Sequence, residues 1–267
     1  MKKITTYTTI ALTSLLLATG CSNTHEGNTT QSHTIQSHTI QSHAKHWGYT
    51  ADVGPSHWSE LNKQYHMCSE GKSQSPINII ASSDIDLPTL ALNYTTNSTS
   101  VIDNGHTVQV NIAGGSTFTI GTDTYELKQF HFHTPSENNI NSKSFPLEAH
   151  FVHATADGKL AVVAVMFEEG EANPILSKIW GNFPLKTGKK TEFKLTANDV
   201  NALLPTDKDY YKFTGSLTTP PCSEQVKWHV IKKPQTISKA QVKQFFDIYG
   251  HTNNRPVQDT NKRVIEE

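Results

Sequence analysis

The unbroken apolar run Leu160–Phe167 constrains the fold of this chain more than any other stretch. A strand that alternates between apolar and polar residues keeps one face in water, but this run has no polar face to expose. The turn signal Asp157-Gly158 comes just before it and limits the run on that side. The run therefore predicts a buried central strand in a sheet that is covered on both faces.

Shorter apolar runs, separated by turn residues such as Asn104-Gly105, lie on both sides of this strand. We expect strands at residues 90–94, 108–112, 117–120, 124–133, 148–155 and 226–231. Helices are few: residues 237–249 combine an apolar stripe with a capping Ser238 and a terminal Gly250, and residues 172–180 fit a shorter helix. The pattern predicts an α+β, predominantly β, fold: a single domain around a large, mostly antiparallel central sheet with short peripheral helices.

The first residues have the pattern of an export signal. Lys2 and Lys3 are followed by an apolar run at 10–18 that is too short to span a membrane, and residues 17–21 end in a lipobox-like cysteine, Cys21. We expect residues 1–20 to be removed and Cys21 to carry a lipid, as in bacterial lipoproteins. An ordinary secretory signal is the alternative. Either way the protein is exported to the periplasm or cell envelope, and a lipid anchor would be its only membrane contact.

Export bears on the remaining cysteines. Disulfides are permitted outside the cytoplasm, and Cys68 and Cys222 remain as an even pair once Cys21 is used, so we predict that they are bridged.

Residues 21–45 are polar and repeat a Gln-Ser-His-Thr-Ile unit, so they predict a tether. Weak zinc gathering by its histidines is the less favoured alternative. The folded domain is expected at residues 46–267, and the net charge of −1 gives no basic surface for nucleic acid.

The expected strand that ends at Gln129–His133 carries the first candidate metal ligands. His131 and His133 are two residues apart and share a strand face, while Phe130 and Phe132 face a core. Two imidazoles placed in this way suit a first-row metal such as zinc, although a bare His-X-His is more often structural.

A second strand could supply a third ligand, either His150 or His153, and periodicity does not choose between them. Gln129 and Glu148 each lie two residues before a histidine, on the same face, and are candidates to bond the other ring nitrogen of a ligand.

These two histidine strands resemble the signature of the α-class carbonic anhydrases, and the resemblance continues in the same order from Trp47 to the C-terminus. The other matching segments are residues 47–49, 73–78, 104–106, 216–221 and 253–256. Thr134 and Pro135 follow His133 where animal members carry a tryptophan, and this departure resembles exported bacterial members. Bacterial members also resemble this chain in having a single disulfide.

The resemblance implies a zinc enzyme for the reversible hydration of carbon dioxide to bicarbonate and a proton, through attack by zinc-bound hydroxide. It makes His131, His133 and His150 the zinc ligands and leaves His153 as a strand histidine. Gln129 would support His131, Glu148 would support His150, and a backbone carbonyl near Asn253 would support His133.

The resemblance also assigns the remaining roles. Thr218 would donate to Glu137 and accept from the hydroxide, and His106 would be the proton shuttle. An apolar wall for carbon dioxide is implied at Val152, Val162, Leu217, Val226 and Trp228. Ordered water is implied at Tyr49, Asn104, Gln109 and Thr219, of which Thr219 also borders the substrate pocket.

Two competing functions are a non-catalytic binding module and a zinc-scavenging lipoprotein. The first would lack a ligand, and the second does not explain residues 216–221. The sequence leaves the oligomeric state open, with a dimer as one possibility.

Overall fold

The computed structural model describes residues 46–183 and 186–267. The expected signal peptide, Cys21 and the tether lie outside the described residues. No helix in the described part of the chain is long and apolar enough to cross a membrane.

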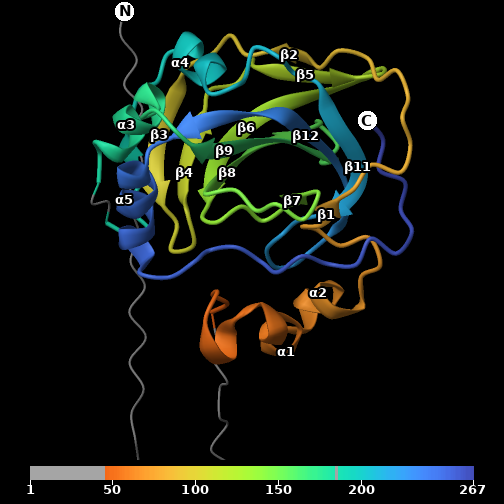
Figure 1. The fold of residues 1–267 in the computed structure, drawn as a ribbon. Coiled ribbons are helices and arrows are strands. Elements are labelled where there is room, and N and C mark those ends of the chain that lie inside the picture. Colours follow the sequence, from red (N-terminus) through yellow and green to blue (C-terminus); the bar gives the residue numbers. More distant parts are fainter. Residues whose placement is uncertain (1–45, 184–185) are drawn as a thin grey trace, which may run out of the picture. The chain divides into compact units, whose positions relative to one another are not determined.

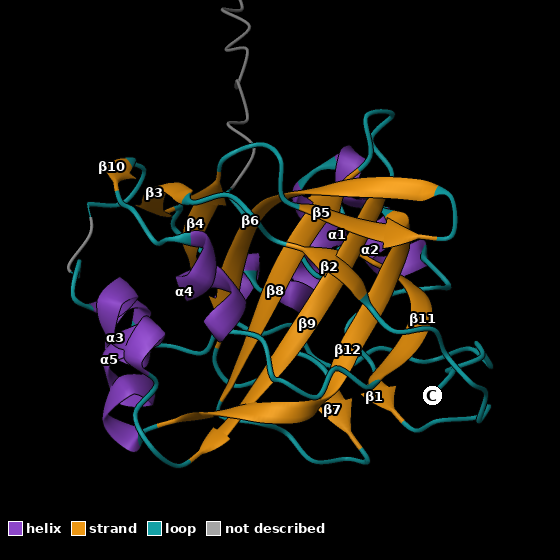
Figure 2. Ribbon diagram, turned by 90° about the horizontal axis from the view of Figure 1, so that it is seen from above, coloured by secondary structure: helices purple, strands orange, loops and turns teal. Residues whose placement is uncertain are grey.

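A ten-stranded sheet forms the centre of the fold, with its long strands side by side (Figures 1 and 2). Its main path runs in the order β10-β3-β4-β6-β8-β9-β12-β11, and β5 joins β2 to β6. The strands are β2 (Ala91–Asn93), β3 (Ser98–Asp103), β4 (Val108–Ile112), β5 (Thr117–Ile120), β6 (Asp123–His133), β8 (Leu147–Ala154), β9 (Leu160–Glu169), β10 (Thr191–Glu192), β11 (Tyr210–Ser216) and β12 (Glu224–Ile237). Only the β9–β12 pair in this sheet is parallel, which confirms the predicted mostly antiparallel architecture.

Strand β9 contains the apolar run of residues 160–167, and both of its faces are buried. Alternate residues enter two different apolar clusters: Ala161, Val163, Val165 and Phe167 enter one, and Val162, Ala164 and Met166 enter the other. The prediction of a central strand without a polar face is confirmed. Because β8 lies beside β9 in register, the same division applies to β8, where Val152 lies opposite Val162.

Two helices pack on one face of the sheet, where Trp180 and Phe245 meet Phe132 of β6 edge to face. α3 (Pro174–Trp180) packs against α5 (Lys239–Tyr249), where the Trp180 indole donates to the Gln241 carbonyl at 2.9 Å and stacks on Phe245 (Figure 1). Ser238 caps α5 through a capping box with Gln241, and Gly250 ends it with a left-handed φ of 68°. Both helices lie where the sequence predicted them, each beginning two residues later. α4 (Ala197–Ala202) is a third short helix.

Other elements were not predicted from the sequence. Residues 51–70 form short helical turns, and a small parallel pair of strands forms a separate sheet. These elements are η1 (Ala51–Val53), η2 (Pro55–His57), α1 (Trp58–Leu61), η3 (Lys63–Tyr65), α2 (Met67–Glu70), β1 (Asn78–Ile79) and β7 (Asn139–Ile140). Strand β11 was also missed, because its burial does not alternate: Tyr210 and Phe213 are buried three residues apart, with Tyr211 and Lys212 both half-buried between them.

The predicted disulfide is present. Cys68, in α2, is bonded to Cys222, in the loop between β11 and β12, with an S–S distance of 2.04 Å and a Cα–Cα distance of 5.0 Å. The bond ties the N-terminal helical segment to the loop that also holds Thr218.

Candidate metal centre and cavity

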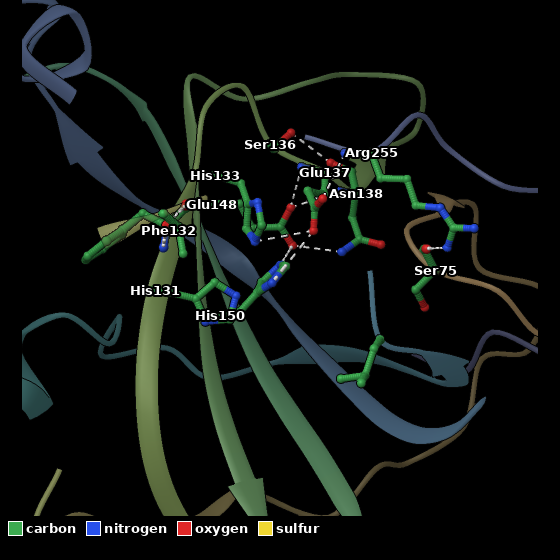
Figure 3. A network of polar contacts seen from close by, with 12 residues as sticks. Ser75, His131, Phe132, His133, Ser136, Glu137, Asn138, Glu148, His150 and Arg255 are labelled. Atoms are coloured by element: carbon green, nitrogen blue, oxygen red, sulfur yellow. Dashed lines mark hydrogen bonds and ion pairs between the residues drawn. The ribbon is translucent and has the colours of Figure 1, made fainter. Parts of the chain in front are cut away.

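Strand register brings the candidate ligands together. His131 and His133 lie on one face of β6, and His150 on β8 is the direct cross-strand partner of His131 (Figure 3). The three ring centroids are 4.7–5.3 Å apart, and one nitrogen from each ring lies within 4.8 Å of the others. Three imidazoles at this spacing can share one metal ion, because zinc–nitrogen bonds are about 2.0–2.1 Å long.

The contacts of each ring decide which nitrogen is free to bind a metal. The Nδ1 of His131 lies 2.9 Å from Gln129 Oε1, and the Nδ1 of His133 lies 2.7 Å from the Asn253 carbonyl oxygen. Since both partners accept here, Nδ1 donates in each ring and the Nε2 lone pair is left free. The Nε2 of His133 is buried and has no hydrogen-bond partner. Such an orphaned nitrogen, facing two others, fits a metal ion.

His150 is held in the opposite sense. Its Nε2 lies 2.9 Å from Glu148 Oε1, which leaves Nδ1 free on the shared side. The contact is short but too poorly aligned to count as a hydrogen bond. Burial lowers the pKa of His131 and His150 well below the usual value and also lowers that of His133. All three rings are therefore neutral at pH 7, as metal ligands must be.

Asn138 is a functional residue that the sequence argument missed. Its backbone N–H and its side-chain amide donate to the two oxygens of Glu148, at 2.8 and 2.7 Å, and the backbone N–H of Glu137 adds a third bond at 2.8 Å (Figure 3). Because Glu148 is fully buried, these donors fix the carboxylate that contacts His150. Burial raises the pKa of Glu148, and the bonds from Asn138 oppose that rise.

The second buried carboxylate, Glu137, lies beside the ligand nitrogens. Its Oε2 is 3.4 Å from His133 Nε2 and 3.9 Å from His150 Nδ1, while Oε1 accepts from the Arg255 N–H at 2.8 Å. Burial raises the pKa of Glu137 to about 8, against the lowering effects of a hydrogen bond from the Thr218 side chain and of Arg255. The structure thus brings Thr218, Glu137 and the three histidines to one place.

Arg255 belongs to one of the matching segments of the sequence, and no role was predicted for it. It is a buried cation beside Glu137. Its guanidinium donates to Gln74 Oε1 at 2.9 Å and to the Ser75 and Cys68 carbonyls at 2.7 and 2.8 Å. It therefore joins the disulfide-bonded helix to the backbone that holds Glu137. No periodic pattern marks a loop residue of this kind.

A cavity of about 150 Å³ opens on the metal centre from its polar side. It is lined by His131 and His133, by the proposed shuttle His106, and by all four residues at which ordered water was expected. The lining residues are Trp47, Tyr49, Asn104, His106, Thr107, Gln109, Gln129, His131, His133 and Thr219. The His106 ring stacks on Trp47 with centroids 3.5 Å apart, and burial, followed by the neighbouring His46, lowers the pKa of His106 to about 4.

The expected apolar wall lies beside His150. Val162, Val226 and Trp228 are buried in one cluster, and Val152 and Leu217 pack against it. The edge of the Trp228 ring meets His150 with centroids 4.9 Å apart, and its indole N–H donates to the Ser216 carbonyl at 3.0 Å. The metal centre therefore has a polar and an apolar side.

His153 is the histidine that the structure separates from the centre. It lies on the opposite face of β8, where its Nε2 is 2.7 Å from the Tyr94 hydroxyl. The ambiguity between His150 and His153 is resolved by cross-strand register.

The three histidines could hold one metal ion, and no fourth His, Cys, Asp or Glu joins the cluster within the described residues, an arrangement that fits a catalytic zinc site better than a structural one. Residues 53–267 match the model of the eukaryotic-type carbonic anhydrase family. A carbonic anhydrase of Pectobacterium carotovorum is 46% identical over 220 residues, which cover 82% of this chain and 90% of that protein.

Solved structures agree with this match. An α-carbonic anhydrase of Thermovibrio ammonificans, in complex with the inhibitor sulfanilamide, has a TM-score of 0.79 at 42% identity and covers 83% of this chain and 99% of that one. The α-carbonic anhydrase of Photobacterium profundum has a TM-score of 0.77 at 46% identity, with coverage of 83% and 100%. The chain belongs to the α-carbonic anhydrase family. Its cofactor is zinc, and its reaction is the reversible hydration of carbon dioxide.

Proposed function

We propose that this chain is an exported, lipid-anchored carbonic anhydrase in which His131, His133 and His150 hold the zinc ion. One observation carries the assignment: three neutral imidazole nitrogens, each fixed by a different partner of its ring, converge on one point. When bound, zinc lowers the pKa of water to about 7 and so supplies a hydroxide nucleophile at neutral pH.

Thr218 and Glu137 orient the nucleophile. Glu137 already accepts from the Arg255 N–H, so its carboxylate is held in place and the Thr218 hydroxyl donates to it. With its own hydrogen committed in this way, the Thr218 oxygen can only accept, and it would orient a hydroxide bound at the centre. The role requires Glu137 to be ionised. The pKa of about 8 that burial and its neighbours give Glu137 would fall if the three histidines held a dication close by.

The two sides of the centre separate substrate from proton. Carbon dioxide is apolar and fits against Val152, Val162, Leu217, Val226 and Trp228, which exclude water there. The proton leaves through the polar cavity, where Tyr49, Asn104, Gln109 and Thr219 can hold ordered water between the centre and His106. Within this cavity Asn104 Nδ2 donates to Gln109 Oε1 at 3.4 Å.

Export and the lipid anchor are supported by the sequence of residues 1–21 and by the disulfide, which is typical of oxidising compartments. Growth with a labelled fatty acid tests the anchor. The natural chain should carry the label and Cys21→Ala should not, whereas a label that persists in the variant rules the anchor out.

Carbon dioxide hydration, measured with and without a zinc chelator on the same sample, tests the function. We expect fast hydration that chelator removes and added zinc restores. A binding module would show no hydration in either state, and a zinc scavenger would bind metal without hydration. Either result would overturn the proposed function.

A further inference from the structure

The backbone between two of the metal ligands lacks a strand partner on one side. The pairing of β4 with β6 ends at Gln109 and His131, but β6 continues to His133. Beyond that point, β8 is the only strand paired with β6 in the described part of the chain. Phe132 lies between the two ligands, so its backbone needs other partners on the β4 side (Figure 3).

The hydroxyl of Thr107 takes the place of that strand partner. It donates to the Phe132 carbonyl at 2.5 Å and accepts from the Phe132 N–H at 3.2 Å. Thr107 is buried and Phe132 is fully buried, so these bonds are shielded from water. The Asn253 amide donates to the same carbonyl at 3.0 Å, which occupies its second lone pair.

Each bond from the hydroxyl fixes a different peptide unit. The Phe132 N–H belongs to the peptide that joins this residue to His131, and the Phe132 carbonyl belongs to the peptide that joins it to His133. A peptide unit is planar, so fixing both units limits how the backbone can turn between the two ligands. One hydroxyl thereby constrains the spacing of two imidazoles whose ring centroids are 5.1 Å apart.

Thr107 and Phe132 are themselves held in place. The Thr107 N–H donates to Asn104 Oδ1 at 2.9 Å, and the Thr107 carbonyl accepts from the Asn104 N–H at 3.1 Å. The Phe132 ring meets Trp180 and Phe245 edge to face in the core. The hydroxyl therefore links two anchored segments of the chain.

We propose that Thr107 is a positioning residue for the zinc centre, which holds His131 and His133 at the spacing that one metal ion requires. It acts through the Phe132 backbone, so it is not a catalytic residue. Ligands that are held in advance lose less freedom when the metal binds, and the hydroxyl should therefore slow zinc release. The inference rests on the zinc ligands of the proposed function.

Zinc release into excess chelator tests the proposal with two variants of the same residue. Thr107→Val keeps the shape of the side chain but leaves the buried Phe132 N–H without this acceptor. We expect zinc to dissociate about fivefold faster, less than the 10–100-fold typical of groups that contact a ligand directly. Thr107→Ser keeps the hydroxyl and should release zinc at close to the natural rate. A natural rate in Thr107→Val, or an equally fast rate in Thr107→Ser, would overturn the proposal.

Thr96→Val is the matched control, at the other end of β4. The Thr96 hydroxyl also donates to a backbone carbonyl, that of Ala113, at 2.7 Å. Ala113 follows the last residue of β4, whereas Thr107 precedes the first. This variant should lose stability and keep the natural rate of zinc release. Equally faster release in Thr96→Val and Thr107→Val would indicate a general loosening of the fold and overturn the proposal.

Cobalt in place of zinc gives a readout of ligand geometry, because its visible absorption depends on the arrangement of its ligands. We expect the spectrum to change in Thr107→Val and to match that of the natural chain in Thr107→Ser and Thr96→Val. Thr107→Ala also lacks the hydroxyl and should repeat the result of Thr107→Val. An unchanged spectrum in both hydroxyl-free variants would contradict a role in ligand geometry.

These readouts do not depend on turnover, so the inference and the proposed function can fail separately. Natural release rates in the hydroxyl-free variants overturn the inference even if the natural chain hydrates carbon dioxide. A natural chain that holds one zinc ion without hydration defeats the proposed function, while its release rate still tests Thr107. Zinc release from His131→Ala at the natural rate would place the metal elsewhere and defeat both.

Discussion

The two faces of β8 carry histidines that are alike in burial and in their lowered pKa but differ in their partners. His150 is 2% exposed and His153 is fully buried, and burial lowers the pKa of both. His150 directs a free nitrogen toward two other imidazoles. His153 bonds Tyr94 and packs edge to face against Phe118, as does His229 of β12 on the same side of the sheet.

The comparison teaches that burial and a lowered pKa do not identify a metal ligand. A neutral imidazole away from water suits both faces of β8. On one face it can coordinate a metal ion, and on the other it packs among aromatic rings. What distinguishes the metal centre is convergence of three nitrogens, each with its second nitrogen occupied by a different partner. The opposite face has pairs of aromatic rings and one Tyr–His hydrogen bond instead.

Removing a ligand should have the largest effect. In His150→Ala, two imidazoles remain, and we expect zinc affinity to fall by more than about 100-fold, since changes to outer partners alone cost about 10–100-fold. Hydration should fall to background. His153→Ala is the matched change on the other face and should retain one zinc per chain by metal analysis. Loss of zinc in His153→Ala would break the comparison.

The next largest loss of zinc affinity is expected at Asn138, which contacts the metal centre only through Glu148. Asn138→Ala removes one of three donors to Glu148, so the carboxylate that contacts His150 is less well fixed. We expect zinc affinity, measured by chelator competition, to fall about tenfold. Asn139→Ala, in which the neighbouring side chain makes none of these contacts, should leave the affinity unchanged. Equal affinities in the two variants would remove Asn138 from the centre.

On the opposite face, the expected effect is on stability and not on zinc. His153→Phe leaves the buried Tyr94 hydroxyl without its partner, which should cost about 1–3 kcal/mol in free energy of unfolding. Adding Tyr94→Phe removes both polar groups, so most of the loss should be recovered. Denaturant unfolding of the two single variants and the double variant measures this coupling, and purely additive losses would contradict it.

Acid should affect the same face through its buried histidines. Burial lowers the pKa of His153 to about 3, and burial and Lys212 lower that of His229 to about 3, whereas an unfolded histidine titrates near 6.5. Between these values the unfolded chain binds more protons, so stability falls as pH decreases from about 6.5 toward 3.

Each such histidine contributes a slope of about 1.4 kcal/mol per pH unit at most. The double variant His153→Phe/Tyr94→Phe should lose one such contribution. Unfolding free energies of metal-free protein at several pH values test this, and an unchanged slope would show that His153 does not titrate in this way.

The sequence predicted which histidines share a strand face better than it predicted which face of β8 carries the third ligand. Alternation placed His131 and His133 on one face, and the apolar run at 160–167 required a strand buried on both sides. Alternation also showed that His150 and His153 lie on opposite faces of β8, but not which face meets β6. That choice depends on cross-strand register, which pairs His131 with His150, and only the resemblance supplied it in advance.

The residues that the sequence argument missed lie in loops or at edges. Asn138 donates two hydrogen bonds to Glu148, and the Arg255 backbone N–H donates one to Glu137. A single residue in a loop leaves no periodic signal. Strand β11 was missed because it is an edge strand whose buried positions do not alternate. The local pattern of residues shows which side chains share a face of a strand. The metal centre also depends on which strands pair in the sheet, and that pattern does not show it.

Zinc titration into metal-free protein, with hydration followed at each addition, tests the central claim most directly. If the converging imidazoles of His131, His133 and His150 form the one site that supports the reaction, hydration should rise in proportion to zinc and reach a plateau at one zinc per chain. A plateau at a higher ratio, or stoichiometric binding without hydration, would contradict the account.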